Sequence, residues 1–333
     1  MIVLNKNNIK DYLIEKKIIR KQQQIKIKKL KGGNVNLLFL IKTKTKQFVI
    51  KQATEEAVNI PGFPIDQDRN KYEVAAIKII SKLLKKNARI PKLYFEDKEN
   101  HIFTMSLVPE NAKLYQTELM AGKFHFDIVY QLAIYTAALH SATYKKEFIL
   151  KQFKTNPGYK LREITTTPAF KKYPEQQMQF EEAFKKNQIN KICLVDGDIT
   201  PKNILIHDNT FTKVDFDIIQ AGDPAQELGI ILAHFLLPAI ANPQWKEEYF
   251  ECVKLFYNTY VKYATYKIPN KFFMNMKNYT ALMMIGRIDS AFTFTWLKSK
   301  KDLVRKMALE LFNTNYQNIN QLLSSCNKNF LLK

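Results

Sequence analysis

The chain of 333 residues has little cysteine, little arginine and few acidic residues. Its three cysteines, Cys193, Cys252 and Cys326, are odd in number and lack the spacing of a metal site, which argues against a disulfide framework and favours a reducing compartment. The longest apolar run, residues 228–241, is too short to span a bilayer and contains His234, so we expect a buried helix there. The first residues lack the apolar stretch of a signal peptide. We therefore expect a cytoplasmic protein without a membrane partner.

The shortage of acidic residues leaves a formal net charge of +21. Such a charge is typical of proteins that bind nucleic acids or acidic membranes. Only six of the 52 basic residues are arginines, however, and arginine is the side chain that nucleic-acid sites prefer for bidentate contacts. We therefore expect no nucleic-acid partner, and nucleic-acid binding stays an alternative that a steep salt dependence would reveal. The same charge disfavours polycationic small molecules as ligands.

Three polar residues in the middle of the chain, Asp198, Asn203 and Asp215, have the spacing of a site that transfers a phosphoryl group from Mg-ATP. The apolar residues between Asn203 and Asp215 predict two strands paired as a hairpin, with a turn at 208–210. That pairing places Asn203 and Asp215 close together, and their oxygen atoms suit Mg²⁺. Asp198 is expected to accept the proton of the acceptor hydroxyl. Asp217 is expected to share the metal, because alternate residues of a strand point to one face.

The first hundred residues carry the parts expected to hold ATP. A glycine pair at 32–33 opens a hairpin whose backbone amides can approach phosphates. Lys51 ends the second strand of that hairpin and would add a point charge. Apolar residues at helical spacing predict a helix over 69–84, in which Glu73 is the expected ion-pair partner of Lys51. The predicted nucleotide-binding residues are Gly32, Gly33, Asn34, Asn36, Lys51 and Glu73.

These motifs resemble those of the aminoglycoside phosphotransferase and choline kinase superfamily over about residues 25–300, and the front half is most similar to methylthioribose kinases. The segments that carry the resemblance are Gly33–Phe39, Phe48–Ala53, Glu118–Lys123, Leu139–Thr143 and Gly222–Gly229. The resemblance implies that Asp198 is the catalytic aspartate and that Asn203 and Asp215 bind the metal. It also implies that Lys51 contacts the phosphates of ATP and that Glu73 is its partner.

Two departures from the family pattern weaken the narrower assignment. The catalytic loop of the family usually reads His-Gly-Asp, and Asp196 stands at the histidine position here. Methylthioribose kinases usually carry Asp-x-Glu at the metal site, where this chain has a second aspartate, Asp217. The acceptor therefore stays open. The residues that we predict for it are Asp223 and Arg287, the latter bound either to the substrate or to Asp289.

The order of these elements predicts an α+β, bilobal, protein-kinase-like fold. Residues 1–108 are expected to form a nucleotide-binding N-lobe, in which a short amphipathic helix over the first 20 residues precedes a small mixed sheet with one helix. Residues 109–333 are expected to form a larger, mostly helical C-lobe with the catalytic loop, the metal site and the acceptor pocket. The sequence leaves open whether the protein forms a homodimer, because the superfamily includes dimers.

The function that these residues favour is a kinase that uses ATP and Mg²⁺ to phosphorylate a hydroxyl of a small, sugar-like metabolite. Two alternatives within the class are an aminoglycoside or other antibiotic kinase and a choline or ethanolamine kinase. An alternative from another class is a nucleotide-binding pseudokinase with a scaffold role, for which Asp196 is the one hint. A pseudokinase has no need to keep Lys51, Glu73, Asp198, Asn203 and Asp215 together.

Overall fold

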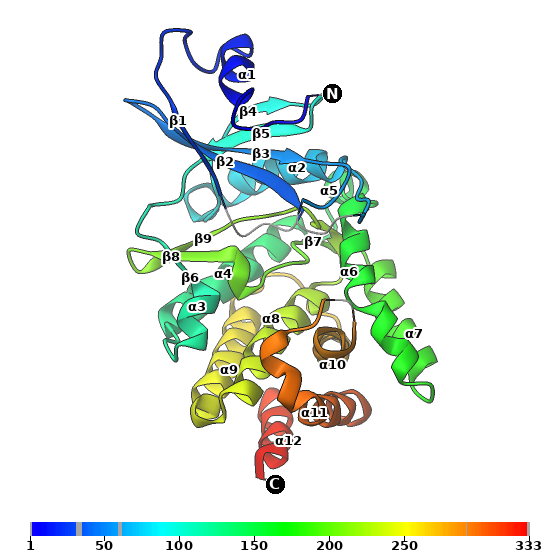
Figure 1. Cartoon of the computed structure of the whole chain (residues 1–333). Helices are drawn as coiled ribbons and strands as arrows, with labels where there is room; N and C mark the ends of the chain where they lie inside the picture. The colour runs from blue at the N-terminus through cyan, green and yellow to red at the C-terminus, as the bar shows by residue number, and fades with distance from the viewer. Residues whose placement is uncertain (1, 31–34, 59–61, 291, 332–333) are drawn as a thin grey trace.

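In the computed structural model, strands gather at the N-terminal end of the protein and helices gather at its C-terminal end (Figure 1). The structure describes residues 2–30, 35–58, 62–290 and 292–331. Gly32, Gly33 and Asn34 lie outside the described residues, so their predicted contacts with ATP stay predictions. The architecture is the α+β, bilobal one expected from the sequence, with a strand-rich N-lobe and a mostly helical C-lobe.

A five-stranded sheet in the order β1-β2-β3-β5-β4 forms the N-lobe. Its strands are β1 (Lys26–Lys29), β2 (Asn36–Lys42), β3 (Gln47–Ala53), β4 (Leu93–Asp97) and β5 (Ile102–Ser106). Every pairing in this sheet is antiparallel, which corrects the expected mixed sheet. The reason is that β2 to β3 and β4 to β5 are joined by four-residue turns, whereas parallel neighbours need a long crossover connection.

Two helices, α1 (Ile9–Glu15) and α2 (Arg69–Leu84), cover the two faces of this sheet. Alternate residues of β3 point to opposite faces. Phe48 and Ile50 pack in the cluster that contains α1, while Val49 packs in the cluster that contains α2. Lys51 follows the same alternation and therefore points toward α2, where Glu73 lies.

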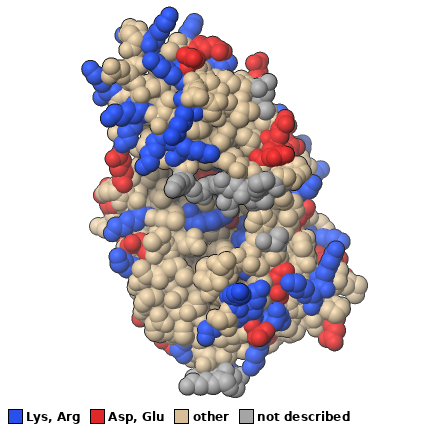
Figure 2. Space-filling view, in the orientation of Figure 1, with Lys and Arg blue, Asp and Glu red and all other residues tan. Residues whose placement is uncertain are grey.

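The N-terminal helix is shorter than the 20 residues expected. It ends at Glu15, and Lys17 then adopts a positive φ of 57°, which takes the chain out of the helical conformation. The lysine-rich segment that follows forms β1, in which Ile27 is half-buried and its neighbouring lysines are exposed. Lysine and arginine side chains accordingly cover much of the N-lobe in Figure 2.

The C-lobe is built mainly from helices. The shorter ones are α3 (Tyr115–Met120), α5 (Glu147–Gln152) and α6 (Lys160–Ile164), and the longer ones are α4 (Phe126–Thr143), α7 (Gln177–Ile189), α8 (Pro224–Ala241), α9 (Lys246–Tyr263), α10 (Phe272–Asp289), α11 (Lys301–Asn313) and α12 (Ile319–Leu331). Among the described helices, α8 alone has the length and apolar composition that could cross a membrane. It is 94% buried inside the protein, as expected for the core helix predicted at 228–241.

Short strands between α7 and α8 carry the central motif. They are β7 (Cys193–Val195), which pairs with β10 (Gln220–Gly222), and β8 (Ile204–His207), which pairs with β9 (Thr210–Lys213) and with β6 (Lys113–Leu114). Asp208 and Asn209 both have positive φ, the geometry of a two-residue hairpin turn that these residue types tolerate. The backbone N–H of Val214 donates to the carbonyl of Asn203 at 3.0 Å. The predicted hairpin is therefore confirmed.

Candidate active site

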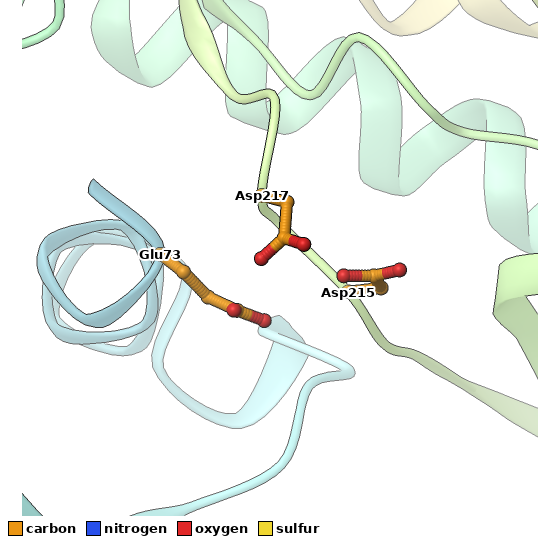
Figure 3. Close-up of side chains that lie close together, drawn as sticks. All are labelled: Glu73, Asp215 and Asp217. Carbon is orange, nitrogen blue, oxygen red and sulfur yellow. The ribbon is translucent and has the colours of Figure 1, made fainter. Parts of the chain in front are cut away.

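The ammonium group of Lys51 lies among three carboxylates that come from separate parts of the chain. Its Nζ is 2.7 Å from Glu73 Oε2, 2.8 Å from Asp215 Oδ1 and 3.2 Å from Asp217 Oδ1. Figure 3 shows the carboxylates turned toward one another, Glu73 from α2 and the two aspartates from the segment after β9. The ion pair expected between Lys51 and Glu73 is present and joins the sheet to α2, while the contacts of Lys51 with Asp215 and Asp217 join it to the C-lobe.

The charges of this cluster stabilise each other although all but Asp215 are buried. Burial works against the charge of Lys51, but the three carboxylates outweigh it and raise the pKa of the lysine above its usual range. Burial also works against the charge of Asp217, and there Lys51 and Arg69 outweigh it and lower the pKa. For Glu73, burial is the larger effect and raises the pKa against the attraction of Lys51.

Asn36 and Arg69 hold Asp217 in place. Asn36 Nδ2 donates to Asp217 Oδ2 at 2.5 Å, and Asn36 Oδ1 accepts from Arg69 Nη2 at 2.9 Å. Both polar atoms of this amide thus have a partner within the protein, and the nucleotide contact predicted for Asn36 stays a prediction. The guanidinium of Arg69 is fully buried and its Nε lies 3.7 Å from Asp217 Oδ2. Sequence reasoning missed Arg69, because nothing in its neighbourhood signals a contact with a residue so far along the chain.

Asp215 reaches the cluster by an unexpected backbone route. Strand β9 ends at Lys213, and Asp215 follows in a loop with a φ of 71°. The expectation that Asp215 and Asp217 alternate along one strand is therefore wrong, although their carboxylates do meet. A positive φ is uncommon for a residue with a side chain, and aspartate is among the types that tolerate it. Here it turns the carboxylate toward Lys51.

The carboxylates around Lys51, all three in contact with its ammonium group, include the kind of oxygen donors that a divalent cation needs. One oxygen from each of Glu73, Asp215 and Asp217 lies within 4.8 Å of the other two, and hard carboxylate oxygens are what Mg²⁺ prefers. The amide nitrogen of Asn203 donates to Asp198, so its side-chain oxygen is the atom available to a metal, and the metal contact of Asn203 stays a prediction. The residues present therefore suit the metal that the sequence predicted.

Asp198 lies on the loop between β7 and β8 and is held by three donors. Its carboxylate accepts from Asn203 Nδ2 at 2.8 Å, and it lies 2.9 Å from Lys202 Nζ and 3.1 Å from Arg162 Nη2. Burial works against its charge, but Lys202 and Arg162 outweigh this effect and hold the pKa of Asp198 well below its usual range. The carboxylate is therefore ionised at neutral pH. Lys202, four residues after Asp198, could have been found from its spacing.

A fully buried ion pair joins the loop of Asp198 to the loop of Asp215. Asp196 Oδ2 lies 2.9 Å from Lys213 Nζ, and Asp196 Oδ1 accepts from the backbone N–H of Asp198 at 3.0 Å. Lys213 Nζ also donates to the carbonyls of Val214 at 2.9 Å and Asp215 at 2.7 Å. Asp196, which stands at the histidine position of the family, thus acts with Lys213 as a brace between the two loops.

Glu227 and Asp223, near the start of α8, also have internal partners. The carboxylate of Glu227 accepts from the backbone N–H groups of Asp196 and Gly197. These hydrogen bonds hold the catalytic loop against α8. Asp223 caps α8 by accepting from the N–H of Ala225 at 2.9 Å and is almost fully buried. This capping position accounts for Asp223 without the substrate contact predicted for it.

Arg287 lies near Asp198 and not in an ion pair with Asp289. Asp289 instead accepts from the hydroxyl of Tyr173 at 2.6 Å and pairs with Arg305 at 3.3 Å. The charge of Asp198 acts on Arg287, and the charge of Arg162 opposes it. The structure therefore removes one of the two partners considered for Arg287.

A cavity of about 800 Å³ opens away from these residues. It is lined by the segments 63–68 and 155–164, among others, and neither Lys51, Asp198 nor Asp215 lines it. Asn156 in its wall donates to the carbonyl of Asp217 at 2.9 Å, so the cavity adjoins the loop that carries Asp217. The chemistry of the side chains, and not the volume of this cavity, therefore locates the candidate site between the lobes.

Comparison with known proteins agrees with this geometry. The model of the phosphotransferase enzyme family (APH) matches residues 26–252. A choline kinase from Cryptosporidium parvum Iowa II superposes with a TM-score of 0.57 at 14% identity, covering 92% of this chain and 99% of that one. A Plasmodium vivax ethanolamine kinase gives 0.53 at 13% identity, covering 99% and 91%.

A third solved structure, the ternary complex of APH(2")-IIa with streptomycin and ATP, gives a TM-score of 0.55 at 15% identity. It covers 94% of this chain and 99% of that one. Among curated proteins, no sequence matches the chain. At these identities the solved structures establish the shared bilobal fold, while the match to the family model extends over more than half of the chain.

Proposed function

Because the chain belongs to the phosphotransferase enzyme family, we propose that it transfers the γ-phosphoryl group of ATP to a hydroxyl of a small, sugar-like metabolite. One observation carries the proposal. The ammonium of Lys51 lies within 2.8 Å of both Glu73 and Asp215, so the parts that such a transfer needs come together from a strand, a helix and a loop. The parts are a cation that binds phosphate, a carboxylate that holds this cation in place, and a carboxylate that binds the metal.

The roles follow from the contacts. Lys51, held by Glu73, binds the phosphates of ATP. Asp215, Asp217 and the oxygen of Asn203 hold Mg²⁺, which when bound neutralises charge on the phosphates. Glu73 remains with Lys51, since burial and that ion pair already fix it.

Asp198 acts on the acceptor. Its ionised carboxylate orients the hydroxyl and accepts its proton as the hydroxyl oxygen bonds to the γ-phosphorus. The bond between that phosphorus and the β–γ bridging oxygen breaks, and ADP leaves. Asn203, Lys202 and Arg162 hold the carboxylate in one position throughout.

The test is a screen for ATP consumption over metabolites and antibiotics that includes methylthioribose, choline, ethanolamine and several aminoglycosides, with phosphorylated products identified by mass spectrometry. We expect transfer to at least one hydroxylated metabolite. Asp198→Asn should lower its rate by about 10²–10⁴-fold, the usual contribution of a general base.

Asp208→Asn is the matched control, because Asp208 is an exposed residue of the β8–β9 turn. That variant should keep the wild-type rate. A product made equally fast by Asp198→Asn would contradict the role of Asp198, and the absence of any phosphorylated product would favour the pseudokinase alternative. A preference for choline or for an aminoglycoside would select the corresponding alternative within the class.

A further inference from the structure

One cation beside the candidate site has no partner in the described part of the chain. Arg287 on α10 is 7% exposed, its guanidinium makes no hydrogen bond or ion pair there, and its Nε is buried without an acceptor. Its contact is with the ring of Phe294, whose centroid is 5.0 Å from the guanidinium carbon. A buried charge without a counter-charge is costly. Such a group is expected to persist where a ligand supplies the opposite charge.

The acidic side chains at the ends of α8 and α10 are already used. Asp289, two residues after Arg287, is taken by Tyr173 and Arg305. Asp223 caps α8, and Glu227 binds two backbone N–H groups of the catalytic loop. Every aspartate and glutamate of the chain lies within the described residues. These carboxylates therefore leave Arg287 without an ion-pair partner among the described residues, and a bound anion would supply one.

Positive charge is in excess around Asp198. This one carboxylate lies within 3.1 Å of both Arg162 and Lys202, and the Nε of Arg162 is also buried without an acceptor. Burial, followed by the charge of Arg162, lowers the pKa of Arg287 to about 10, so the guanidinium is still charged at neutral pH. Asp198 pairs with Arg162 and acts on Arg287 only through its charge, so both guanidinium groups keep hydrogen-bonding capacity for an anion.

The wall next to Arg287 is aromatic and neutral. Phe294 stacks on Trp296 with ring centroids 4.9 Å apart, and the ring of His234 lies 5.9 Å from Phe294. Burial, aided by the charge of Arg287, lowers the pKa of His234 to about 3, so this histidine is neutral. Together with Pro201 of the catalytic loop these three rings line a small cavity of about 10 Å³. A cationic ligand would find aromatic faces here but no free carboxylate, and Arg287 already occupies one face of Phe294.

We propose that the acceptor carries an anionic group, a carboxylate or a phosphate, that Arg287 binds while the hydroxyl of the acceptor lies at Asp198. This inference rests on the proposed function and narrows its substrate class. The planar fork of arginine matches both kinds of anion. Aminoglycosides and choline should be poor acceptors, because their positive charge would be repelled by Arg287, Arg162 and Lys202.

The experiment uses the full chain and two matched series of acceptors. One is ribose, ribonate and ribose 5-phosphate, and the other is glycerol, glycerate and glycerol 3-phosphate, with choline and kanamycin as cationic acceptors. We expect kcat/KM for an anionic member to exceed that for its neutral parent. Arg287→Met should reduce this ratio about 10- to 100-fold, the effect of losing a hydrogen bond to a charged group. Arg287→Lys should restore part of it.

Arg305→Met is the matched control, because Arg305 is bound to Asp289 and Asp302 and not to the site. It should leave the ratio unchanged. A variant that merely misfolds lowers kcat/KM for both members of a pair equally, so the ratio separates binding from stability. The carboxylate and phosphate arms identify which anion is preferred.

Trp296 gives a readout that needs no turnover. In a Trp245→Phe background, its fluorescence should change on titration with an anionic member and not with its neutral parent, and Arg287→Met should abolish that change. Equal use of neutral or cationic acceptors, or an Arg287→Met variant with an unchanged ratio, overturns the inference and leaves the kinase function standing. No transfer to any acceptor, with Asp198→Asn and wild type alike, is instead a failure of the kinase function. The fluorescence titration still decides in that case whether Arg287 binds an anion.

Discussion

The two sides of the candidate site differ in how their charges are balanced. On the metal side, Lys51 meets three carboxylates, and Arg69 and Asn36 complete the contacts of Asp217. On the acceptor side, one carboxylate, Asp198, faces three cations. Negative charge is thus in excess where a cation is expected, and positive charge is in excess where the acceptor is expected.

This difference shows which part of the function belongs to the family and which to this chain. A metal and a triphosphate are common to ATP-dependent kinases, and the metal side supplies ligands for both from its own residues. The acceptor varies from one kinase to another, and the acceptor side keeps Arg287 unpaired. A charge that the chain leaves unbalanced is therefore informative about a ligand.

The largest effect is expected from removing charge on the metal side. Asp215→Asn takes away one carboxylate of the donor set, so we expect the maximal rate to fall about 10³-fold, comparable to the loss of one electrostatic contact in a transition state. The Mg²⁺ concentration for half-maximal rate should rise as well. Initial rates at several Mg²⁺ concentrations check both. Asp68→Asn, which removes an exposed carboxylate that pairs with Lys71, should leave the Mg²⁺ dependence as it is in the wild type.

If the Mg²⁺ dependence of Asp215→Asn equals that of the wild type, the excess of negative charge does not serve a metal. Thermal unfolding without Mg²⁺ provides the check on folding, since Asp215 is partly exposed and its carboxylate contacts only Lys51 among the described residues.

Sequence reasoning found the residues whose chemistry is carried by a local pattern. Asp198, Asn203 and Asp215 follow from their spacing and from a hairpin whose turn residues, Asp208 and Asn209, are themselves recognisable. Lys51 and Glu73 follow from the order of strand and helix. In each case the pattern lies within a few residues of the functional side chain.

The residues that the sequence did not reveal depend on contacts between distant segments. Lys213 is one lysine among many until the fold brings it to Asp196. Arg69 begins a predicted helix, and only the tertiary structure aims it at Asp217. Long-range charge pairing has no local signature, which is why these residues were missed.

The second prediction concerns the ion pair between Asp196 and Lys213, which joins the two sides of the candidate site. Lys213→Met leaves the carboxylate of Asp196 buried without its cation, so we expect the free energy of unfolding to fall by about 3–5 kcal/mol. Removing both charges in Asp196→Leu, Lys213→Met should cost less than the sum of the single changes. Urea unfolding of the four proteins gives this coupling energy.

Lys78→Met is the control for the second prediction, because its pair with Glu96 is at the surface and such pairs contribute about 0–1 kcal/mol. Lys213→Met should also raise the Mg²⁺ requirement, since Lys213 binds the carbonyl of Asp215. Additive stability changes together with a normal Mg²⁺ requirement would mean that the two sides of the site are positioned independently.

The smallest expected effect is a difference in how Asp196 and Asp198, the two aspartates of the catalytic loop, make the stability of the protein depend on pH. Burial, opposed by Lys213, raises the pKa of Asp196 to about 7, whereas Lys202 and Arg162 overcome burial and lower that of Asp198. A raised pKa means that the folded state binds the extra proton. The contribution of Asp196 is therefore present below its unfolded pKa near 4 and is lost as pH rises toward 7.

We therefore expect the stability difference between wild type and Asp196→Asn to fall by about 1–3 kcal/mol as pH rises from 5 to 7. The difference between wild type and Asp198→Asn should stay constant over the same interval, because Asp198 is ionised in both the folded and the unfolded chain there. Urea unfolding at pH 5, 6 and 7 measures both differences, and effects of the buried histidines cancel within each pair. Parallel pH profiles for the two variants would show that the cations around Asp198 do not set it apart from its neighbour, and the contrast drawn between the two sides would lose its electrostatic basis.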